Sequence, residues 1–258
     1  MIEVNNLVKR YGNHTAVDHL SFKIEKGKIY GFLGPNGAGK STTMNMITGY
    51  IASTEGTVKI DGHDILEEPE AAKKCIGYLP EQPPVYFDMT VLEYMKFVAD
   101  LKKIPKDKKA NMIEEVMDMV KISDMRNRLI KNLSKGYRQR VGLAEAIMGY
   151  PEVIILDEPF SGLDPVNSQT LKEVVQEQIQ DGKLVIFSSH QMNYVEEFCE
   201  DIAIINNGEI ALSGDIADIK AEYGKNQLII SAVGMGAEEL AEKLKTSCAE
   251  YIICNRNT

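Results

Sequence analysis

The residues best suited to chemistry form a glycine-rich loop that ends in a lysine and two hydroxyl side chains. The loop fits the pattern G-x-x-x-x-G-K-[ST] and consists of Gly34, Pro35, Asn36, Gly37, Ala38, Gly39, Lys40, Ser41 and Thr42. Glycines let the backbone wrap closely around phosphate groups and point its N–H groups inward, at the positive end of the next helix. Lys40 can then reach the β- and γ-phosphates, and the Ser41 hydroxyl can bind Mg²⁺. A simple glycine turn is the alternative, but the apolar strand before the loop and the helical run after it favour a phosphate site.

Two adjacent carboxylates supply the second half of such a site. Asp157 and Glu158 directly follow the apolar run 153–156, at the predicted end of a buried strand. Asp157 would hold Mg²⁺ directly or through water, and Glu158 would orient or deprotonate the attacking water. Acidic residues after strands can also cap helices, yet Pro159 and the earlier phosphate loop favour the role at the metal. The two segments together predict a site for Mg²⁺ and a nucleoside triphosphate.

The elements that must position these groups alternate between strands and helices, which predicts an α/β fold with a mostly parallel sheet. The runs 28–33, 153–156 and 184–187 are short and apolar, as strands covered on both faces should be. Residues 2–7 and 17–24 predict a separate small antiparallel sheet, with turns at Gly12 and Gly27. Asn206-Asn207-Gly208, between two apolar segments, predicts a hairpin.

A helical insert and a terminal appendage complete the expected organisation. Apolar residues recur at helical spacing in 91–101 and 112–120, and the methionines there are expected to fill the core. We expect a main domain over 1–225, with the helical insert at about 88–150. A small α/β appendage is predicted over 226–258, from the apolar runs 228–230 and 251–253 and a helical pattern at 237–245.

Composition bounds the classes of protein to which the chain can belong. With 258 residues, 44% hydrophobic and 26% charged, the chain can bury one sizeable core. A formal net charge of -9 argues against nucleic acid as a partner, because phosphate neutralisation requires a surplus of Lys and Arg. Cys75, Cys199, Cys248 and Cys254 form no C-x-x-C pair, which fits reduced thiols in the cytoplasm. No apolar run approaches the roughly 18 residues that cross a bilayer, so we expect no membrane span.

Along nearly its whole length, the sequence resembles the nucleotide-binding domain of ABC transporters, the P-loop ATPases with an added antiparallel β-subdomain and a helical signature subdomain. The segment 133–137, Leu-Ser-Lys-Gly-Tyr, occupies the position of the family's LSGGQ signature. Ser134 and Gly136 match the signature, whereas Lys135 and Tyr137 depart from it. The resemblance implies that Ser134 and the backbone N–H groups at the helix start bind the γ-phosphate of ATP on the opposite subunit.

Other motifs follow in the order of the family. Asp164 ends a segment, 161–164, that resembles the D-loop linking the two sites across the dimer. His190 resembles the switch histidine that contacts the γ-phosphate. Tyr11 stands where the family places an aromatic side chain that stacks on adenine, although ordinary packing is the alternative. For the Q-loop, family spacing favours Glu81 and residue type favours Gln82, and we prefer Glu81; an oxygen of either side chain can bind Mg²⁺ or its water.

The resemblance implies an ATPase that uses ATP and Mg²⁺ and closes head to tail with a second such subunit, identical or different. It also implies separate transmembrane permease subunits, a cytoplasmic position on the inner face of the cell membrane, and export as the direction of transport. A soluble ABC ATPase that serves ribosomes, DNA repair or cluster assembly is the alternative. The fused ATPase domains and long coiled coils of those classes do not occur in this sequence. A binder that cannot hydrolyse ATP is a third possibility, which Glu158 and His190 argue against.

Overall fold

The computed structural model describes residues 1–223. The chain divides into two compact units, Met1–Ala217 and Asp218–Thr258. The first unit contains every motif introduced above. The runs 228–230 and 251–253 and the helical pattern 237–245, predicted for the appendage, lie outside the described residues, so the appendage stays a prediction.

The centre of the first unit is a six-stranded sheet in the order β10-β9-β3-β8-β7-β6. Its strands are β3 (Ile29–Leu33), β6 (Ile76–Leu79), β7 (Val153–Asp157), β8 (Leu184–Ser189), β9 (Asp201–Asn206) and β10 (Glu209–Asp215). All neighbouring pairs are parallel except β9 and β10. Every residue of β3, β7 and β8 is buried, as expected for strands covered by other elements on both faces. The predicted α/β class with a mostly parallel core sheet is confirmed.

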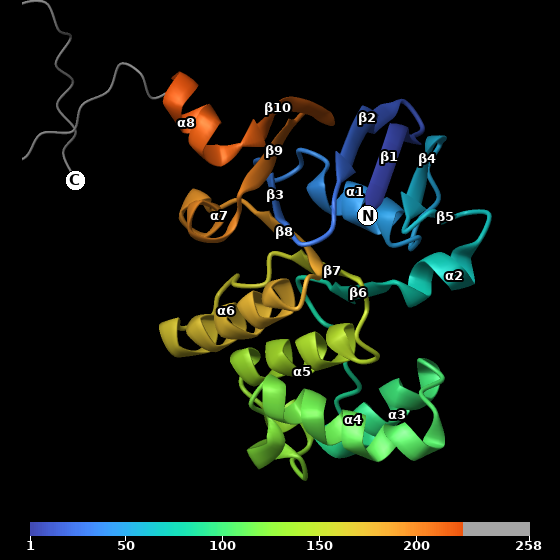
Figure 1. Ribbon diagram of the computed structural model, residues 1–258, viewed down its shortest axis with the longest axis vertical. Helices are drawn as coiled ribbons and strands as arrows, with labels where there is room; N and C mark the ends of the chain where they lie inside the picture. Colours follow the sequence, from blue (N-terminus) through green and yellow to red (C-terminus); the bar gives the residue numbers. More distant parts are fainter. Residues whose placement is uncertain (224–258) are drawn as a thin grey trace, which may run out of the picture. The chain divides into compact units, whose positions relative to one another are not determined.

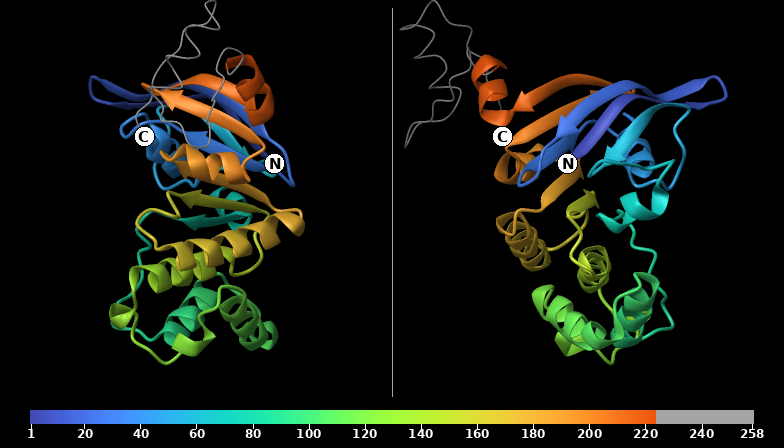
Figure 2. Two further views of the ribbon diagram at one scale, coloured as in Figure 1. Left: turned by 90° about the vertical axis from the view of Figure 1, so that its left-hand side faces the viewer. Right: turned by 45° about the vertical axis from the view of Figure 1, so that its right-hand side comes forward.

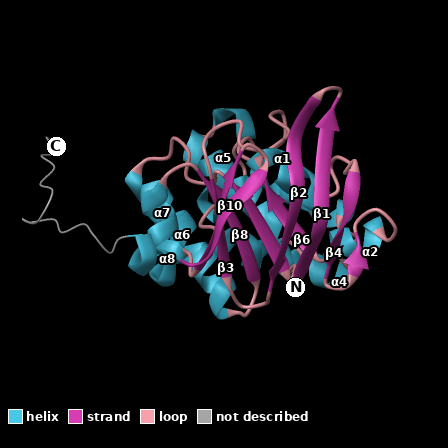
Figure 3. Cartoon of the chain, turned by 90° about the horizontal axis from the view of Figure 1, so that it is seen from above, coloured by secondary structure: helices cyan, strands magenta, loops and turns pink. Residues whose placement is uncertain are grey.

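A second, antiparallel sheet has the order β2-β1-β4-β5. It consists of β1 (Ile2–Tyr11), β2 (His14–Ile24), β4 (Glu55–Ile60) and β5 (His63–Asp64), and Figure 3 shows β2, β1 and β4 side by side. The pairing of β1 with β2 confirms the predicted small sheet. The strand β4 was not predicted, because only Val58 and Ile60 mark its buried face. Gly56 lets β4 approach β1 closely, since an added Cβ would lie 2.2 Å from the Asn6 carbonyl oxygen.

The helix α1 (Lys40–Ile47) and the helix α5 (Lys135–Ile147) pack on opposite faces of the six-stranded sheet. Tyr30, Phe32, Ile155 and Ile186 belong to the core that also contains α1 and the antiparallel sheet. Along a strand, alternate residues face opposite sides of the sheet, so the residues between these core residues face the side on which α5 lies. On β6, for example, a Cβ added to Gly77 would lie 2.2 Å from the carbonyl oxygen of Ala146 in α5. The two faces therefore carry different parts of the predicted site.

The helical insert is visible as the green and yellow-green helices in Figures 1 and 2, and its yellow-green helix α5 packs beside β6 of the six-stranded sheet. It contains α3 (Val91–Leu101), α4 (Lys106–Met119) and α5, with 3₁₀ turns at Ser123–Met125 and Ile130–Asn132. A capping box of Thr90 and Glu93 starts α3. Met95 and Met117 are fully buried, as predicted for core-filling methionines. The helix α4 begins earlier than the predicted 112–120, because Pro105 starts it and its first turns are polar.

The first unit also contains the helices α2 (Pro69–Lys74), α6 (Pro165–Gln180) and α7 (Met192–Phe198). The helix α6 packs on β8, and α7 packs on β3 and β8. The helix α8 (Ile216–Tyr223) begins as the first unit ends. The predicted hairpin is confirmed: β9 and β10 are joined through Asn207 and Gly208, both with positive φ. The Gly208 N–H donates to the Ala38 carbonyl at 2.9 Å, so the hairpin turn holds the glycine-rich loop in place.

Candidate functional site

The predicted chemical residues follow three neighbouring parallel strands at their carboxyl ends. The glycine-rich loop follows β3, Asp157 ends β7, and His190 follows β8, with the strands in the order β3-β8-β7. In open α/β sheets this edge is where ligands bind. Segments far apart in the sequence thus meet at one place, as a nucleotide site requires.

The glycine-rich loop has a backbone conformation that depends on its glycines. Gly34, Gly37 and Gly39 have φ values of 153°, 83° and 107°, in the region that side-chain-bearing residues rarely adopt. Space is also restricted: a Cβ on Gly34 would lie 2.3 Å from the Ile205 carbonyl oxygen, and one on Gly39 would lie 2.7 Å from that of Ala16. The loop is therefore held in one curled conformation.

Lys40 begins α1, and its side chain turns back into the loop. It is 6% exposed, and its Nζ donates to the Gly34 carbonyl at 2.6 Å and to the Pro35 carbonyl at 3.2 Å. No side chain caps the start of α1 at Gly39, so its first backbone N–H groups can bind an anion. Ser41 is exposed in the first turn and Thr42 is half-buried. A lysine ammonium and free helix N–H groups at one position form a phosphate cradle.

Ser188 connects the two acidic residues, and sequence reasoning did not assign it a role. Its side chain is fully buried, and its hydroxyl donates to Asp157 Oδ1. The Glu158 backbone N–H donates to Ser188 Oγ at 3.1 Å and to the Ser188 carbonyl at 3.2 Å. The only sequence signal for Ser188 is its place in the serine pair before His190. This contact fixes the Asp157 carboxylate at the end of β7.

Glu158 and His190 face each other across the end of the sheet. His190 Nδ1 lies 2.9 Å from Glu158 Oε1, with the carboxylate 12% exposed and the imidazole 43% exposed. Glu158 has a φ of 47°, a conformation that is uncommon for residues with a side chain and often occurs at functional sites. The pair has the reach needed to orient a water molecule between itself and a phosphate.

The signature segment 133–137 forms the start of α5. Ser134 is its exposed N-cap, and the Ser134 hydroxyl accepts from the Tyr137 backbone N–H at 3.3 Å. Leu133, just before it, is buried and anchors the turn. An exposed serine at a helix start presents a hydroxyl and backbone N–H groups to an external anion.

The two departures from the LSGGQ pattern make contacts of their own. Tyr137 donates its hydroxyl to Asp124 Oδ2 at 3.1 Å, and its ring lies under the Arg140 guanidinium at 4.0 Å. Lys135 extends over the D-loop, where a Cβ added to Gly162 would lie 2.6 Å from Lys135 Nζ. Both substitutions therefore pack within the subunit and leave Ser134 and the helix start accessible.

Position 136 is buried and leaves no space for a side chain. A Cβ at this position would lie 2.3–2.6 Å from the side-chain amide atoms of Asn167 on α6. Gly136→Ala is expected to lower the melting temperature by about 2–12 °C, because overpacking costs about 1–3 kcal/mol and each kcal/mol shifts Tm by about 2–4 °C at this size. Differential scanning calorimetry checks this. The same change in an Asn167→Ala background should cost clearly less, and an unchanged Tm for Gly136→Ala alone would contradict the steric account.

The D-loop residue Asp164 is the N-cap of α6. Its Oδ1 accepts from the Asn167 backbone N–H at 3.0 Å, and its Oδ2 accepts from the Asn167 side-chain amide. These hydrogen bonds lower the pKa of Asp164, so the carboxylate stays ionised. Asp164 is exposed at the surface of the subunit.

Tyr11 and the two Q-loop candidates, Glu81 and Gln82, are exposed to solvent. Tyr11 ends β1 with 52% of its surface exposed, and Lys9 Nζ lies 5.2 Å from its ring centre. A flat exposed face suits stacking on a base. Glu81 and Gln82 are both exposed on the loop after β6, and the choice between them stays open.

The residues would suit a magnesium ion whose other ligands came from phosphate oxygens and water. Within residues 1–223 there is no group of three or more His, Cys, Asp or Glu side chains suited to holding a metal. Mg²⁺ commonly uses one or two carboxylates together with substrate phosphates. Asp157, with one carboxylate oxygen already fixed by Ser188, and the exposed Ser41 hydroxyl offer that kind of partial ligand set.

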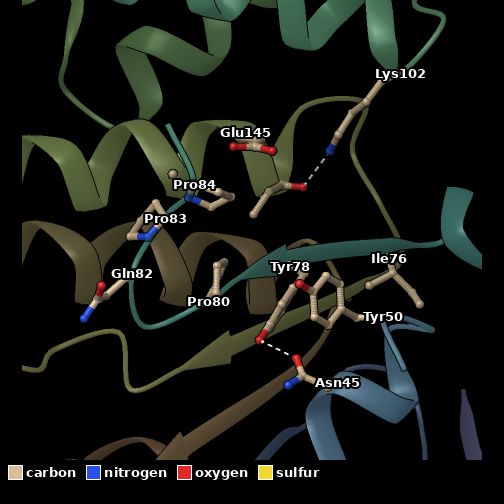
Figure 4. A pocket seen from close by; sticks show the side chains of 12 residues that line it. Asn45, Tyr50, Ile76, Tyr78, Pro80, Gln82, Pro83, Pro84, Lys102 and Glu145 are labelled. Atoms are coloured by element: carbon tan, nitrogen blue, oxygen red, sulfur yellow. Dashed lines mark hydrogen bonds between the residues drawn. The ribbon is translucent and has the colours of Figure 1, made fainter. Parts of the chain in front are cut away.

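A cavity of about 500 Å³ lies beside the Q-loop and is lined by none of the residues 34–42. Figure 4 shows Gln82, Pro83 and Pro84 on one side of it, and Lys102 above the end of α5. Lys102 Nζ donates to the carbonyls of Ala146 and Met148 at 3.1 and 2.8 Å, and burial lowers its pKa to about 8. The remaining lining residues are Asn45, Tyr50, Ile76, Tyr78, Pro80, Gly142, Glu145 and Ala146.

Comparison with known proteins agrees with the geometry. A profile described as ABC transporter matches residues 17–161, more than half of the chain. The uncharacterized ABC transporter ATP-binding protein YhaQ of Bacillus subtilis is 37% identical over 89% of this chain and 76% of its own length. The bacitracin transport ATP-binding protein BcrA of Bacillus licheniformis is 36% identical over 81% of this chain and 68% of its own.

A solved structure gives the same result for the fold. The ATP-binding cassette MJ0796, in a dimeric post-hydrolysis state with ADP and Pi, aligns with a TM-score of 0.76 and 26% identity. The alignment covers 84% of this chain and 99% of that one. No helix among residues 1–223 is long and apolar enough to cross a membrane. From its motifs, their convergence at one sheet edge and these likenesses, the chain belongs to the ABC transporter family, as an ATP-binding subunit with the fold of the family's ATPase.

Proposed function

We propose that the chain hydrolyses ATP at the edge where β3, β7 and β8 end, with Glu158 as the group that orients and deprotonates the attacking water. The observation that supports this most directly is the pairing of Glu158 Oε1 with His190 Nδ1 at 2.9 Å, next to the phosphate loop in sheet order. Lys40 and the first N–H groups of α1 bind the β- and γ-phosphates, and His190 contacts the γ-phosphate.

A bound Mg²⁺ would neutralise charge on the β- and γ-phosphate oxygens. Asp157, Ser41 and either Glu81 or Gln82 would hold it, directly or through water. Tyr11 stacks on the adenine ring. Asn36 and Gly37, exposed at the tip of the loop, complete the phosphate contacts through their backbone.

A second ATPase subunit, identical or different, closes each site. The supporting observation is the position of Ser134: it is exposed, and its helix lies on the opposite face of the sheet from α1. In a head-to-tail dimer, Ser134 and Gly136 of one subunit meet the γ-phosphate held by Lys40 of the other. The dimeric state of the MJ0796 cassette supports this arrangement.

Hydrolysis then opens the dimer. The γ-phosphate is the group that both subunits contact, so its release removes the shared contacts and lets the subunits separate. Repeated closure and opening can move attached proteins. The site thus converts ATP hydrolysis into a change in the distance between subunits.

The attached proteins are separate transmembrane permease subunits, which dock at the cavity beside Gln82 on the inner face of the membrane. This cavity lies between the helical insert and the sheet, where motion of the Q-loop would reach a partner. Its wall is mostly apolar, with the Lys102 side chain held by the carbonyls of Ala146 and Met148. The bacitracin transport protein among the relatives supports a role in transport, and we infer export as its direction.

Tyr50→Glu is expected to reduce capture of the transmembrane partner by about tenfold or more, because an aromatic anchor at an interface contributes about 1.4 kcal/mol or more. Tyr50 lines the cavity and is 80% exposed, so the fold should tolerate the change. The measurement is affinity purification from detergent-solubilised membranes, followed by identification of the co-purifying proteins. Leu66→Glu is the matched control, since Leu66 is also exposed and apolar but does not line the cavity. Recovery of only soluble partners by the wild type would refute the transporter assignment.

A further inference from the structure

The signature helix, α5, contacts the D-loop segment 161–164 through Lys135 and the start of α6 through Asn167. Gly136 on α5 leaves just enough space for it, because the Asn167 amide occupies the volume that any Cβ at position 136 would take. Asn167 lies in the first turn of α6, three residues after Asp164. Asn167 belongs neither to the signature segment 133–137 nor to the D-loop segment 161–164, so neither motif predicts this contact.

Both polar atoms of the Asn167 side chain and its backbone N–H make hydrogen bonds here. Its backbone N–H and its Nδ2 donate to the two carboxylate oxygens of Asp164. Its Oδ1 accepts from an Arg140 guanidinium nitrogen at 2.8 Å. The amide is thereby fixed in orientation, with its nitrogen toward the D-loop and its oxygen toward the signature helix.

Arg140 is 8% exposed and is held by neutral groups. Besides Asn167, it donates to the Lys121 carbonyl at 2.9 Å and stacks on the Tyr137 ring at 4.0 Å. It takes part in none of the ion pairs found within residues 1–223, and its buried Nε has no hydrogen-bond partner there. Burying a guanidinium without a carboxylate costs stability, so packing alone does not account for arginine at this position.

The same guanidinium reaches the helical insert. Lys121 follows α4, and Asp124, which accepts from the Tyr137 hydroxyl, lies in the next 3₁₀ turn. Arg140 therefore joins three parts of the subunit: the insert, the start of the signature helix and, through Asn167, the D-loop. A shift of any one of them must either move the others or break a buried hydrogen bond.

We propose that Arg140 and Asn167 are positioning residues, which hold Ser134 in a fixed relation to the D-loop so that the two can meet the partner subunit together. The proposal rests on the head-to-tail ATPase described above and deepens it. In that dimer Ser134 acts on the partner's γ-phosphate and Asp164 lies at the subunit boundary. Closure of the dimer completes the site only when Ser134 and Asp164 reach the partner subunit in the correct relative position. The Arg140–Asn167 hydrogen bond fixes that relative position.

The first test is Asn167→Ala in the full chain, assayed for ATP hydrolysis. We expect kcat to fall about 10- to 100-fold, as when a catalytic group is displaced by about 1 Å. The KM for ATP and the binding of a fluorescent ATP analogue to the monomer should change less than about twofold, because the phosphate loop of the same chain is untouched. In a Glu158→Gln background, dimer formation with ATP should require about tenfold more protein.

The second test separates positioning from charge. Arg140→Met keeps the aliphatic stem but removes all donors, whereas Arg140→Lys keeps the charge and cannot serve both acceptors in the fork geometry of a guanidinium. Both variants should show the loss in kcat seen for Asn167→Ala, and the Arg140→Met/Asn167→Ala double variant should lose no more than the worse single variant. Gln176→Ala, exposed on α6, and Arg126→Met, in the ion pair with Glu114, are the matched controls and should keep wild-type kcat.

These experiments distinguish a failure of the positioning proposal from a failure of the proposed ATPase function. If the wild type hydrolyses ATP and Glu158→Gln forms ATP-dependent dimers, but Asn167→Ala keeps wild-type kcat, the positioning proposal is wrong while the ATPase proposal stands. Full activity of Arg140→Lys would likewise overturn it, since charge alone would then suffice. If the wild type itself neither hydrolyses ATP nor dimerises, the proposed function fails first. Circular dichroism of each variant shows whether a loss of kcat reflects unfolding; an Asn167→Ala variant that loses kcat only by unfolding refutes the proposal.

Discussion

Glu158→Gln is expected to lower the rate of ATP hydrolysis by about 100- to 10,000-fold, which is the range for loss of a general base. Glutamine keeps the size of the side chain and an oxygen that can face His190, but it cannot take a proton from water. Binding of ATP should persist, because Lys40 and the loop N–H groups are unchanged. The variant should therefore accumulate as an ATP-bound dimer, held together by the γ-phosphate that is no longer released.

Two measurements check this result. Phosphate release gives the rate, and light scattering after size exclusion gives the mass with and without ATP. Glu177→Gln on α6 is the matched control, since Glu177 is exposed and outside the site. Equal rates for Glu158→Gln and wild type would remove Glu158 from the mechanism. A variant that stays monomeric with ATP, even when the transmembrane partner is supplied, would argue against the head-to-tail dimer.

Lys40→Met is expected to weaken the binding of Mg·ATP by about 10- to 100-fold, since hydrogen bonds from charged groups contribute about 1.5–3 kcal/mol each. The lysine ammonium is fixed inside the curl of the loop by the carbonyls of Gly34 and Pro35. Methionine has a similar length and can fill the same buried space, but it offers neither charge nor donors. The loss should thus appear in affinity and not in folding.

Isothermal titration with Mg·ATP measures the affinity, and a thermal melt without nucleotide measures the fold. Lys73→Met is the matched control: Lys73 Nζ also donates to a backbone carbonyl, that of Gly49 at 3.1 Å, but away from the phosphate loop. The control should bind like the wild type. Unchanged affinity in Lys40→Met would mean that the backbone N–H groups alone hold the phosphates, and the assignment of Lys40 to the β- and γ-phosphates would be withdrawn.

The departures from the signature pattern have a structural explanation in this chain. Tyr137, in place of glutamine, supplies the ring on which Arg140 stacks. Lys135, in place of glycine, lies against Gly162 of the D-loop. Both side chains thus strengthen contacts between the signature helix and its surroundings in the same subunit. The groups that the signature offers to a partner, the Ser134 hydroxyl and the helix N–H groups, are left exposed.

Much of the fold could be predicted because the responsible features are local. The strands β3, β7 and β8 are apolar at successive positions because layers cover both of their faces, and a short window of sequence records this. The strand β4 escaped prediction because one of its faces is exposed, so only Val58 and Ile60 mark it. The start of α4 was missed for a similar reason: its first turns are polar, and periodicity appears only where the helix meets the core.

The amino-acid sequence by itself determined the phosphate loop, the acidic pair and the hairpin turn, because each depends on backbone conformations and side chains within a few residues. Only the tertiary structure decided that Ser188 holds Asp157 from 31 residues away, and that Asn167 fills the space beside Gly136. It also decided that Arg140 is buried among an amide, a carbonyl and a ring. Such contacts join side chains from separate elements, and the packing of those elements decides which side chains come within hydrogen-bonding distance.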